Sequence, residues 1–117
     1  MPFDDIQGEN ESMLLENNLI KDNIRADNQS FLYYLHEENV FDKQSLADLC
    51  HYIEKLDSIS IELLRDLHFI EQQILRHLVY HFDSNDLSKI SNLPIDYWGY
   101  LEPFEHAVEN LYEYDLE

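Results

Sequence analysis

The feature that most constrains the fold is a long run from Ile61 to Phe82 whose apolar side chains recur at helical spacing. The run reads IELLRDLHFIEQQILRHLVYHF and contains neither glycine nor proline. At about 100° per residue, its apolar side chains gather within an arc of about 140°. They are Leu63, Leu64, Leu67, Ile70, Ile74, Leu75, Leu78 and Phe82. A helix with such a face must bury it against other helices, so we expect this run to form the spine of a bundle.

Three earlier segments show the same spacing. They predict helices over residues 12–26, 31–39 and 43–56. In the third segment the apolar residues recur at i, i+3, i+4, i+7 and i+10, which gives a continuous stripe on one face. They are Leu46, Leu49, Cys50, Ile53 and Leu56.

Residues typical of helix ends separate these segments. Asn39 is a plausible stop for the second helix, and Asp42 has the side chain of an N-cap for the third. Either Ser58 or Ser60 is expected to cap the long helix at its start.

The chain after the long helix is rich in turn and cap residues. The stretch DSNDLSKISNLPID predicts one short helix that begins at Asp86 and ends by Pro94. A final helix is expected to begin through Tyr97 and Trp98, with Pro103 either as a kink or in the first turn of its main part.

The composition agrees with an all-α fold. Only two glycines and three prolines occur in 117 residues, too few for a turn-rich β-sandwich or a glycine-rich phosphate loop. The chain length suits one domain with one core. We therefore expect a single-domain bundle of five or six helices with short loops over residues 13–117, preceded by a flexible acidic segment, residues 1–12.

Charge is the strongest global property of the chain. Twenty-five Asp and Glu residues against seven Lys and Arg residues give a formal net charge of −18. Binding to nucleic acid or to anionic membranes relies on cations, so neither is expected as a direct partner. A strong negative field favours rapid capture of a basic protein, although an acidic surface can also serve solubility alone.

The cysteine content and the lack of a signal peptide or membrane span predict a soluble, cytoplasmic protein. The single cysteine, Cys50, cannot form an intramolecular disulfide and lies on the apolar stripe of 43–56, where it is expected to act as a small buried hydrophobic residue. The N-terminal residues lack the basic and apolar regions of a signal peptide. No run approaches the ~20 apolar residues of a membrane span.

His77 and His81 lie one helical turn apart, a spacing that can place two imidazoles on one metal ion. A zinc enzyme of the H-E-x-x-H type needs Glu after the first His, and here that residue is Leu78. Both histidines lie at the margin of the apolar arc, where imidazole rings usually pack. We expect a packing role, with a small metalloenzyme as the less favoured alternative.

Glu71 falls inside the apolar arc of the long run, which is unusual for a carboxylate. It must be paired with a neighbour such as His68 or a tyrosine, or the helix must be rotated so that Glu71 reaches its edge. Both interpretations remain open from the sequence.

The C-terminal segment carries an acidic stripe. Residues 96–117 contain seven acidic residues and no Lys or Arg. Four glutamates fall within about 80° on one helical face; they are Glu102, Glu105, Glu109 and Glu113. Like charges four residues apart destabilise a free helix, so a cationic partner would relieve the stripe, although a plain solvated face is the alternative.

Aromatic and acidic residues adjoin this stripe. Trp98 lies between Tyr97 and Tyr100, and rings interleaved with carboxylates suit protein recognition, unless they close the end of the bundle. The candidate contact residues for a partner are Asp83, Asp86, Asp96, Trp98, Glu102, Glu105, Glu109 and Glu113.

Two stretches, FLYYLHEENVFDKQSLADLC and ILRHLVYHFDSNDLSKISNLPIDYWGYLEPFEHAVE, resemble a family of small α-helical immunity proteins from bacterial polymorphic-toxin and contact-dependent growth inhibition systems. The resemblance covers residues 30–112. It implies a protein that is not an enzyme and that neutralises a cognate toxin domain by binding it in the cytosol. The resemblance transfers no contact residues to this chain.

The expected function is therefore that of an immunity protein for a basic, cytosol-acting toxin such as a nuclease. The alternative is an acidic nucleic-acid mimic or an inhibitor of another basic protein. Neither interpretation involves a cofactor, and the oligomeric state is left open.

Overall fold

The computed structural model describes residues 18–85 and 89–115, and every regular element among them is helical. In chain order the elements are α2 (Leu19–Arg25), α3 (Phe31–Tyr33), the π-helix η1 (Tyr34–Glu38), α4 (Lys43–Glu54), α5 (Ile61–Phe82) and α6 (Tyr97–Asp115). Because α3 continues directly into η1, these elements form five helical bodies. The prediction of an all-α, single-domain bundle is confirmed.

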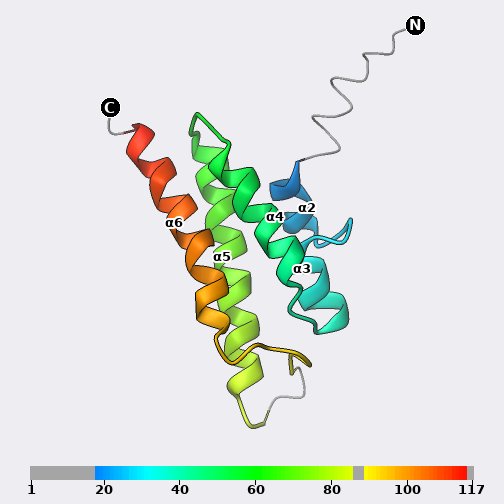
Figure 1. Ribbon diagram of the computed structural model, residues 1–117. Coiled ribbons are helices and arrows are strands. Elements are labelled where there is room, and N and C mark those ends of the chain that lie inside the picture. Colours follow the sequence, from blue (N-terminus) through cyan, green and yellow to red (C-terminus); the bar gives the residue numbers. More distant parts are fainter. Residues whose placement is uncertain (1–17, 86–88, 116–117) are drawn as a thin grey trace, which may run out of the picture.

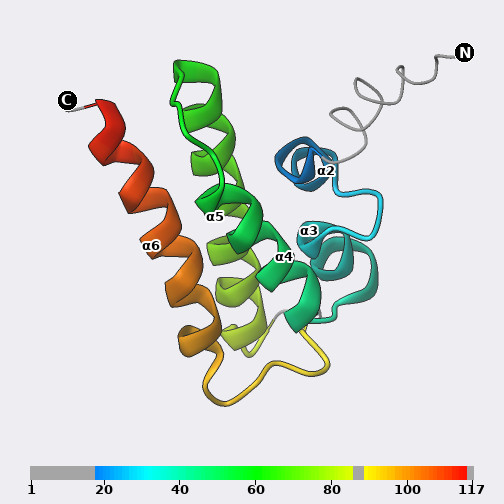
Figure 2. The same cartoon turned by 45° about the horizontal axis from the view of Figure 1, so that its top comes forward.

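Three longer helices form the body of the molecule (Figure 1). Helices α4 and α6 run in one direction and α5 runs in the other. Helix α6 packs closely against α4, while α2 packs against α5. The short α2 and α3 lie on the side away from α6 (Figure 2), so the outer surface of α6 stays open.

Side-chain caps fix where these helices begin. The Asp42 carboxylate accepts a hydrogen bond from the Ser45 backbone N–H at 2.9 Å, which confirms Asp42 as the N-cap of α4. The Ser60 hydroxyl accepts one from the Leu63 N–H at 3.0 Å. Of the two serines that could cap α5, Ser60 is therefore the one that does.

Left-handed residues end two of the helices. Asn39 has φ = 55°, and its N–H donates to the Tyr34 carbonyl, so the predicted stop at Asn39 is confirmed. Ala26 ends α2 with the same φ of 55°. Helix α2 begins at Leu19, after its N-cap Asn18. A helix was predicted over residues 12–26, and residues 12–17 of it lie outside the described residues. The segment predicted to be flexible, residues 1–12, also lies outside them.

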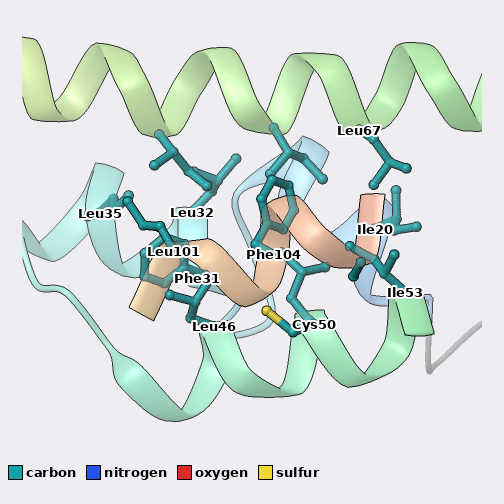
Figure 3. Packing of buried hydrophobic residues seen from close by; sticks show 14 of the residues in the cluster. Ile20, Phe31, Leu32, Leu35, Leu46, Cys50, Ile53, Leu67, Leu101 and Phe104 are labelled. Atoms are coloured by element: carbon teal, nitrogen blue, oxygen red, sulfur yellow. The ribbon is translucent and has the colours of Figure 1, made fainter. Parts of the chain in front are cut away.

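Every helix contributes side chains to one core (Figure 3). The buried hydrophobic residues are Ile20, Phe31, Leu32, Leu35, Phe41, Leu46, Leu49, Cys50, Ile53, Leu67, Ile70, Ile74, Leu78, Ile90, Leu101, Phe104, Ala107 and Leu111. The stripe predicted on 43–56 is confirmed for all members except Leu56, which follows the end of α4 and is only partly buried.

The buried face of α5 is narrower than its apolar arc. Four side chains spanning about 80° are buried, namely Leu67, Ile70, Ile74 and Leu78. Leu75 and Phe82, which were expected inside, are 42% and 61% exposed. The expectation was wrong for them because α2, α3 and α6 contact α5 from one side only, which leaves the margin of the arc in solvent.

The segment after α5 is not helical in its described part. Residues 89–94 form an irregular loop instead of the end of the helix predicted from Asp86 to Pro94, and residues 86–88 lie outside the described ranges. Polar groups of this loop form hydrogen bonds with residues far away in the sequence, whereas in a helix they would bond carbonyls one turn away. The Asn92 amide accepts from the Phe41 N–H at 2.7 Å and donates to the Phe41 carbonyl at 3.1 Å.

None of the helices in residues 18–85 and 89–115 combines the length and the apolarity needed to cross a membrane.

Candidate partner-binding surface

Helix α6 carries the acidic stripe, and its start is fixed by the preceding loop. The Tyr97 N–H donates to the Pro94 carbonyl at 3.1 Å, and the Gly99 N–H donates to the Asp96 carbonyl at 2.9 Å. Helix α6 is continuous from Tyr97 to Asp115, and Pro103 lies inside it, past the first turn. The alternative in which Pro103 lies in the first turn of the helix is therefore wrong. The ring of a proline inside a helix crowds the carbonyl of the residue four positions earlier, which here is Gly99.

The four glutamates of the stripe lie on the outer face of α6. Glu102, Glu109 and Glu113 are exposed, and Glu105 is partly buried. The opposite face buries Leu101, Phe104, Ala107 and Leu111, which orients the helix and turns the stripe to solvent. The structure therefore brings these four predicted residues onto one surface.

No cation of the described chain neutralises this stripe. Among residues 18–85 and 89–115 the ion pairs are those of Lys21 with Glu62 and Asp66, both at 2.7 Å, on the α2–α5 side of the molecule. The Lys43 ammonium lies 4.7 Å from the centre of the Tyr100 ring, not against a carboxylate. The stripe thus keeps its charge available to another molecule.

A shallow apolar groove between α5 and α6 adjoins the stripe. Its lining residues are Glu71, Ile74, Leu75, Trp98, Leu101, Phe104 and Glu105. Trp98 is 44% exposed, so its ring lies partly at the surface instead of closing the bundle end completely. Two carboxylates, Glu71 and Glu105, lie on this small hollow of about 10 Å³, whose other lining side chains are apolar.

Glu71 therefore occupies the edge of the α5 core face. It is partly exposed, and the described residues provide neither a hydrogen bond nor an ion pair to its carboxylate. His68 is exposed and lines a different hollow, so it does not pair with Glu71. Of the two interpretations, the structure agrees with the one in which α5 is rotated enough for Glu71 to reach its edge.

Two of the three predicted aspartates, Asp83 and Asp96, lie near the end of the molecule where α5 ends and α6 begins. Asp83 is exposed and accepts a hydrogen bond from the Asn85 N–H at 2.9 Å. Asp96 is exposed at the start of α6. The Phe82 and Tyr97 rings, with centroids 5.9 Å apart, join the two helix ends. Asp86 lies outside the described residues, so its position in this surface stays a prediction.

The histidine pair does not converge on one point. His77 Nε2 lies 2.7 Å from His36 Nδ1, whereas His81 Nδ1 accepts a hydrogen bond from the Ile90 N–H at 2.9 Å. Within residues 18–85 and 89–115, no group of three or more His, Cys, Asp or Glu side chains is placed to hold a metal ion. The packing role expected for both rings is what the described contacts show.

The contact between His36 and His77 was not predicted, because 41 residues separate the two rings and no local pattern marks the pair. Burial lowers the pKa of His77 to about 4, with further contributions from His36 and Arg76. Burial also lowers the pKa of His36. Both rings are thus held in the neutral form that lets one nitrogen donate and the other accept.

Cys50 behaves as the sequence predicts. It is buried in the core, and burial raises the pKa of its thiol to about 11. The thiolate form that nucleophilic chemistry needs is therefore disfavoured at neutral pH.

No protein-family model matches the chain, and comparisons with curated proteins and with solved structures find no match.

Proposed function

We propose that this protein is a cytoplasmic immunity protein, not an enzyme, that binds and neutralises a basic toxin domain through α6. One observation carries the proposal. Four glutamates form a stripe on the outer face of α6, and no described cation contacts them in a chain of net charge −18. The resemblance of residues 30–112 to small helical immunity proteins supports the same conclusion.

The charge of the stripe acts first at long range. A negative field around α6 attracts a cationic protein surface and raises the association rate, an effect that salt screens over a Debye length of about 10 Å at 0.1 M. Glu105 with Glu109, and Glu109 with Glu113, are like-charge neighbours one turn apart in the free protein. A partner that supplies Lys or Arg removes this repulsion on binding.

The α5–α6 groove acts at short range. The partly exposed Trp98 and Leu75 offer apolar contact area, since a ring in a desolvated interface carries more binding energy than a rim charge. An Arg of the partner that crosses the groove can stack on Trp98 and bond Glu71 or Glu105. We therefore place the centre of the contact at Trp98 and its charged rim along α6.

The first experiment identifies the partner. The product of the adjacent reading frame is co-expressed with this protein, and we expect the two to co-purify with equal stoichiometry and this protein to rescue growth. A neighbouring product that neither inhibits growth nor binds would contradict the immunity role.

The second experiment tests the surface. Glu102→Lys with Glu109→Lys reverses two charges of the stripe, and Asp27→Lys with Glu37→Lys makes the same charge change at exposed sites outside α6. We expect the association rate at low salt to fall about tenfold or more for the α6 variant and much less for the control. Equal effects of the two variants, or a rate indifferent to salt, would remove α6 from the proposal.

A further inference from the structure

The outward side of α5 carries a second surface of a different character. Its residues, named here the outer face of α5, are Ile61, Leu64, Arg65, His68, Phe69, Gln72, Arg76 and Val79. Ile61 is 65% exposed, Val79 is 64% exposed and Phe69 is 41% exposed. The first six of these residues line a hollow of about 550 Å³ in which apolar surface predominates. Contiguous exposed apolar surface of this kind marks a site of interaction.

The spacing of these side chains fits a helix as the occupant. Steps of three and four residues lead from Ile61 through Leu64, His68, Gln72 and Leu75 to Val79. This alternation produces a nearly straight seam along α5, which is the geometry by which one helix packs along another.

Two arginines lie on the outer face of α5, whereas the stripe on α6 consists of glutamates. The lining of the hollow includes Arg65 and no carboxylate. Arg76 lies on the same side of the helix three turns further on, where its Nε donates to the Tyr80 hydroxyl at 3.1 Å. Neither guanidinium forms an ion pair with a described residue. The two guanidiniums can therefore bond carboxylates of an incoming helix, and the nearest carboxylates of α5, Glu62 and Glu71, lie at the two margins of the face.

We propose that the outer face of α5 binds an amphipathic helix of another protein whose apolar stripe is bordered by Asp or Glu. The apolar stripe would cover Ile61, Leu64 and Val79, and the acidic border would meet Arg65 and Arg76. This site differs in charge preference from the α6 stripe proposed for a basic toxin, and it adjoins the α5–α6 groove, since Leu75 belongs to both the seam and the groove.

A second copy of this chain is a poorer occupant on the same grounds. Two α5 helices paired antiparallel about the middle of the seam would place Arg65 of one copy beside Arg76 of the other. Charge complementarity therefore favours an acidic helix from a different protein.

The test uses two designed helical peptides, each about three heptads long with leucine at the a and d positions. One carries Glu at the flanking positions and the other carries Lys. We expect the Glu peptide to bind the full chain and to lose about tenfold or more in affinity when Ile61→Gln and Val79→Gln are combined. Arg65→Glu with Arg76→Glu should weaken the same peptide to a similar extent.

The Lys peptide provides the control, because its expected site is the acidic stripe on α6. Its affinity should fall with Glu102→Gln and Glu109→Gln and stay unchanged with the Ile61 and Val79 substitutions. All the substituted side chains are exposed, and circular dichroism verifies that each variant keeps its helix content.

Three results would overturn the proposal. The Glu peptide could fail to bind, or its affinity could be unaffected by both α5 variants. Sedimentation could also show a wild-type dimer that the Ile61 and Val79 substitutions abolish, which would assign the face to a second copy. Failure of the α6 charge-reversal experiment, by contrast, would leave this inference intact.

Discussion

At the scale of single residues, two polar contacts within the fold have the clearest consequences for stability. His36 and His77 share one hydrogen bond of 2.7 Å, which requires at least one ring to be neutral. Asn23, 1% exposed, bonds the Leu19 carbonyl at 2.8 Å and the Leu32 N–H at 2.9 Å, and so links α2 to α3. Each contact leads to a stability prediction.

The histidine contact predicts a loss of stability in weak acid. The folded-state pKa of His77, about 4, lies below its ordinary value of 6.5, so the unfolded chain binds the proton more readily. The stabilisation is therefore complete above about pH 6.5 and is lost as the pH falls from there toward 4. Because the ring is partly exposed to solvent, we expect a loss of roughly 1–2 kcal/mol.

Urea unfolding between pH 7 and 5 measures this loss. His77→Gln, which keeps a donor for His36, should flatten the pH dependence in that window. His106→Gln, at an exposed position on α6, is the matched control and should leave it unchanged. Identical slopes for wild type and His77→Gln would exclude the histidine contact as the cause.

The buried amide predicts a larger effect. Asn23→Ala removes the acceptor of the Leu32 N–H and leaves that group buried without a partner, so we expect destabilisation of about 2–3 kcal/mol. Asn110→Ala, at an exposed position on α6, should change stability by less than about 0.5 kcal/mol. Chemical denaturation of both variants makes the comparison, and similar losses would show that Asn23 is not a structural link.

At the scale of elements, the positions of helix ends follow from local chemistry. Asp42 and Asn39 were identified from residue type, and the cap of α5 was narrowed to Ser58 or Ser60, because a cap bonds backbone within its own turn. The end of α2 is different. Ala26 adopts φ = 55°, a conformation that suits glycine and strains a residue with a Cβ.

This strain predicts that Ala26→Gly stabilises the protein by about 0.5–1 kcal/mol. Ala47→Gly makes the same chemical change inside α4, where the backbone is helical, and should destabilise by about 1 kcal/mol. Thermal unfolding of the two variants should therefore shift in opposite directions. A lower melting temperature for Ala26→Gly would mean that the lost methyl contact outweighs the relief of strain.

Features that depend only on neighbouring residues could be predicted from the sequence, and features that depend on distant residues could not. The stripe of α6 was predictable because helical spacing alone places Glu102 to Glu113 on one face. The exposure of Leu75 and Phe82 depends on which side of α5 the other helices cover, and helical spacing does not contain that information. The loop around Asn92 was misassigned for a similar reason, since its hydrogen bonds to Phe41 span 51 residues.

At the scale of the whole molecule, the distribution of charge matters more than any single pair. The net charge of −18 is carried on a small bundle whose ion pairs, among the described residues, are confined to Lys21. The free protein is therefore destabilised by its own repulsion, which a basic partner or added salt reduces. If a basic toxin is the partner, as proposed, binding relieves this repulsion and the complex is favoured over the free protein.

Repulsion of this kind predicts that salt stabilises the free protein. Between about 10 mM and 300 mM NaCl, the Debye length falls from about 30 Å to less than 10 Å, and we expect the melting temperature to rise by several degrees. Glu109→Gln with Glu113→Gln removes both like-charge pairs of α6, Glu105 with Glu109 and Glu109 with Glu113, so this variant should melt higher than wild type at low salt and gain less from added salt. Sodium chloride must be the salt, since sulfate also strengthens apolar burial. A melting temperature that is constant or falls over this range would show that repulsion across the surface does not limit stability.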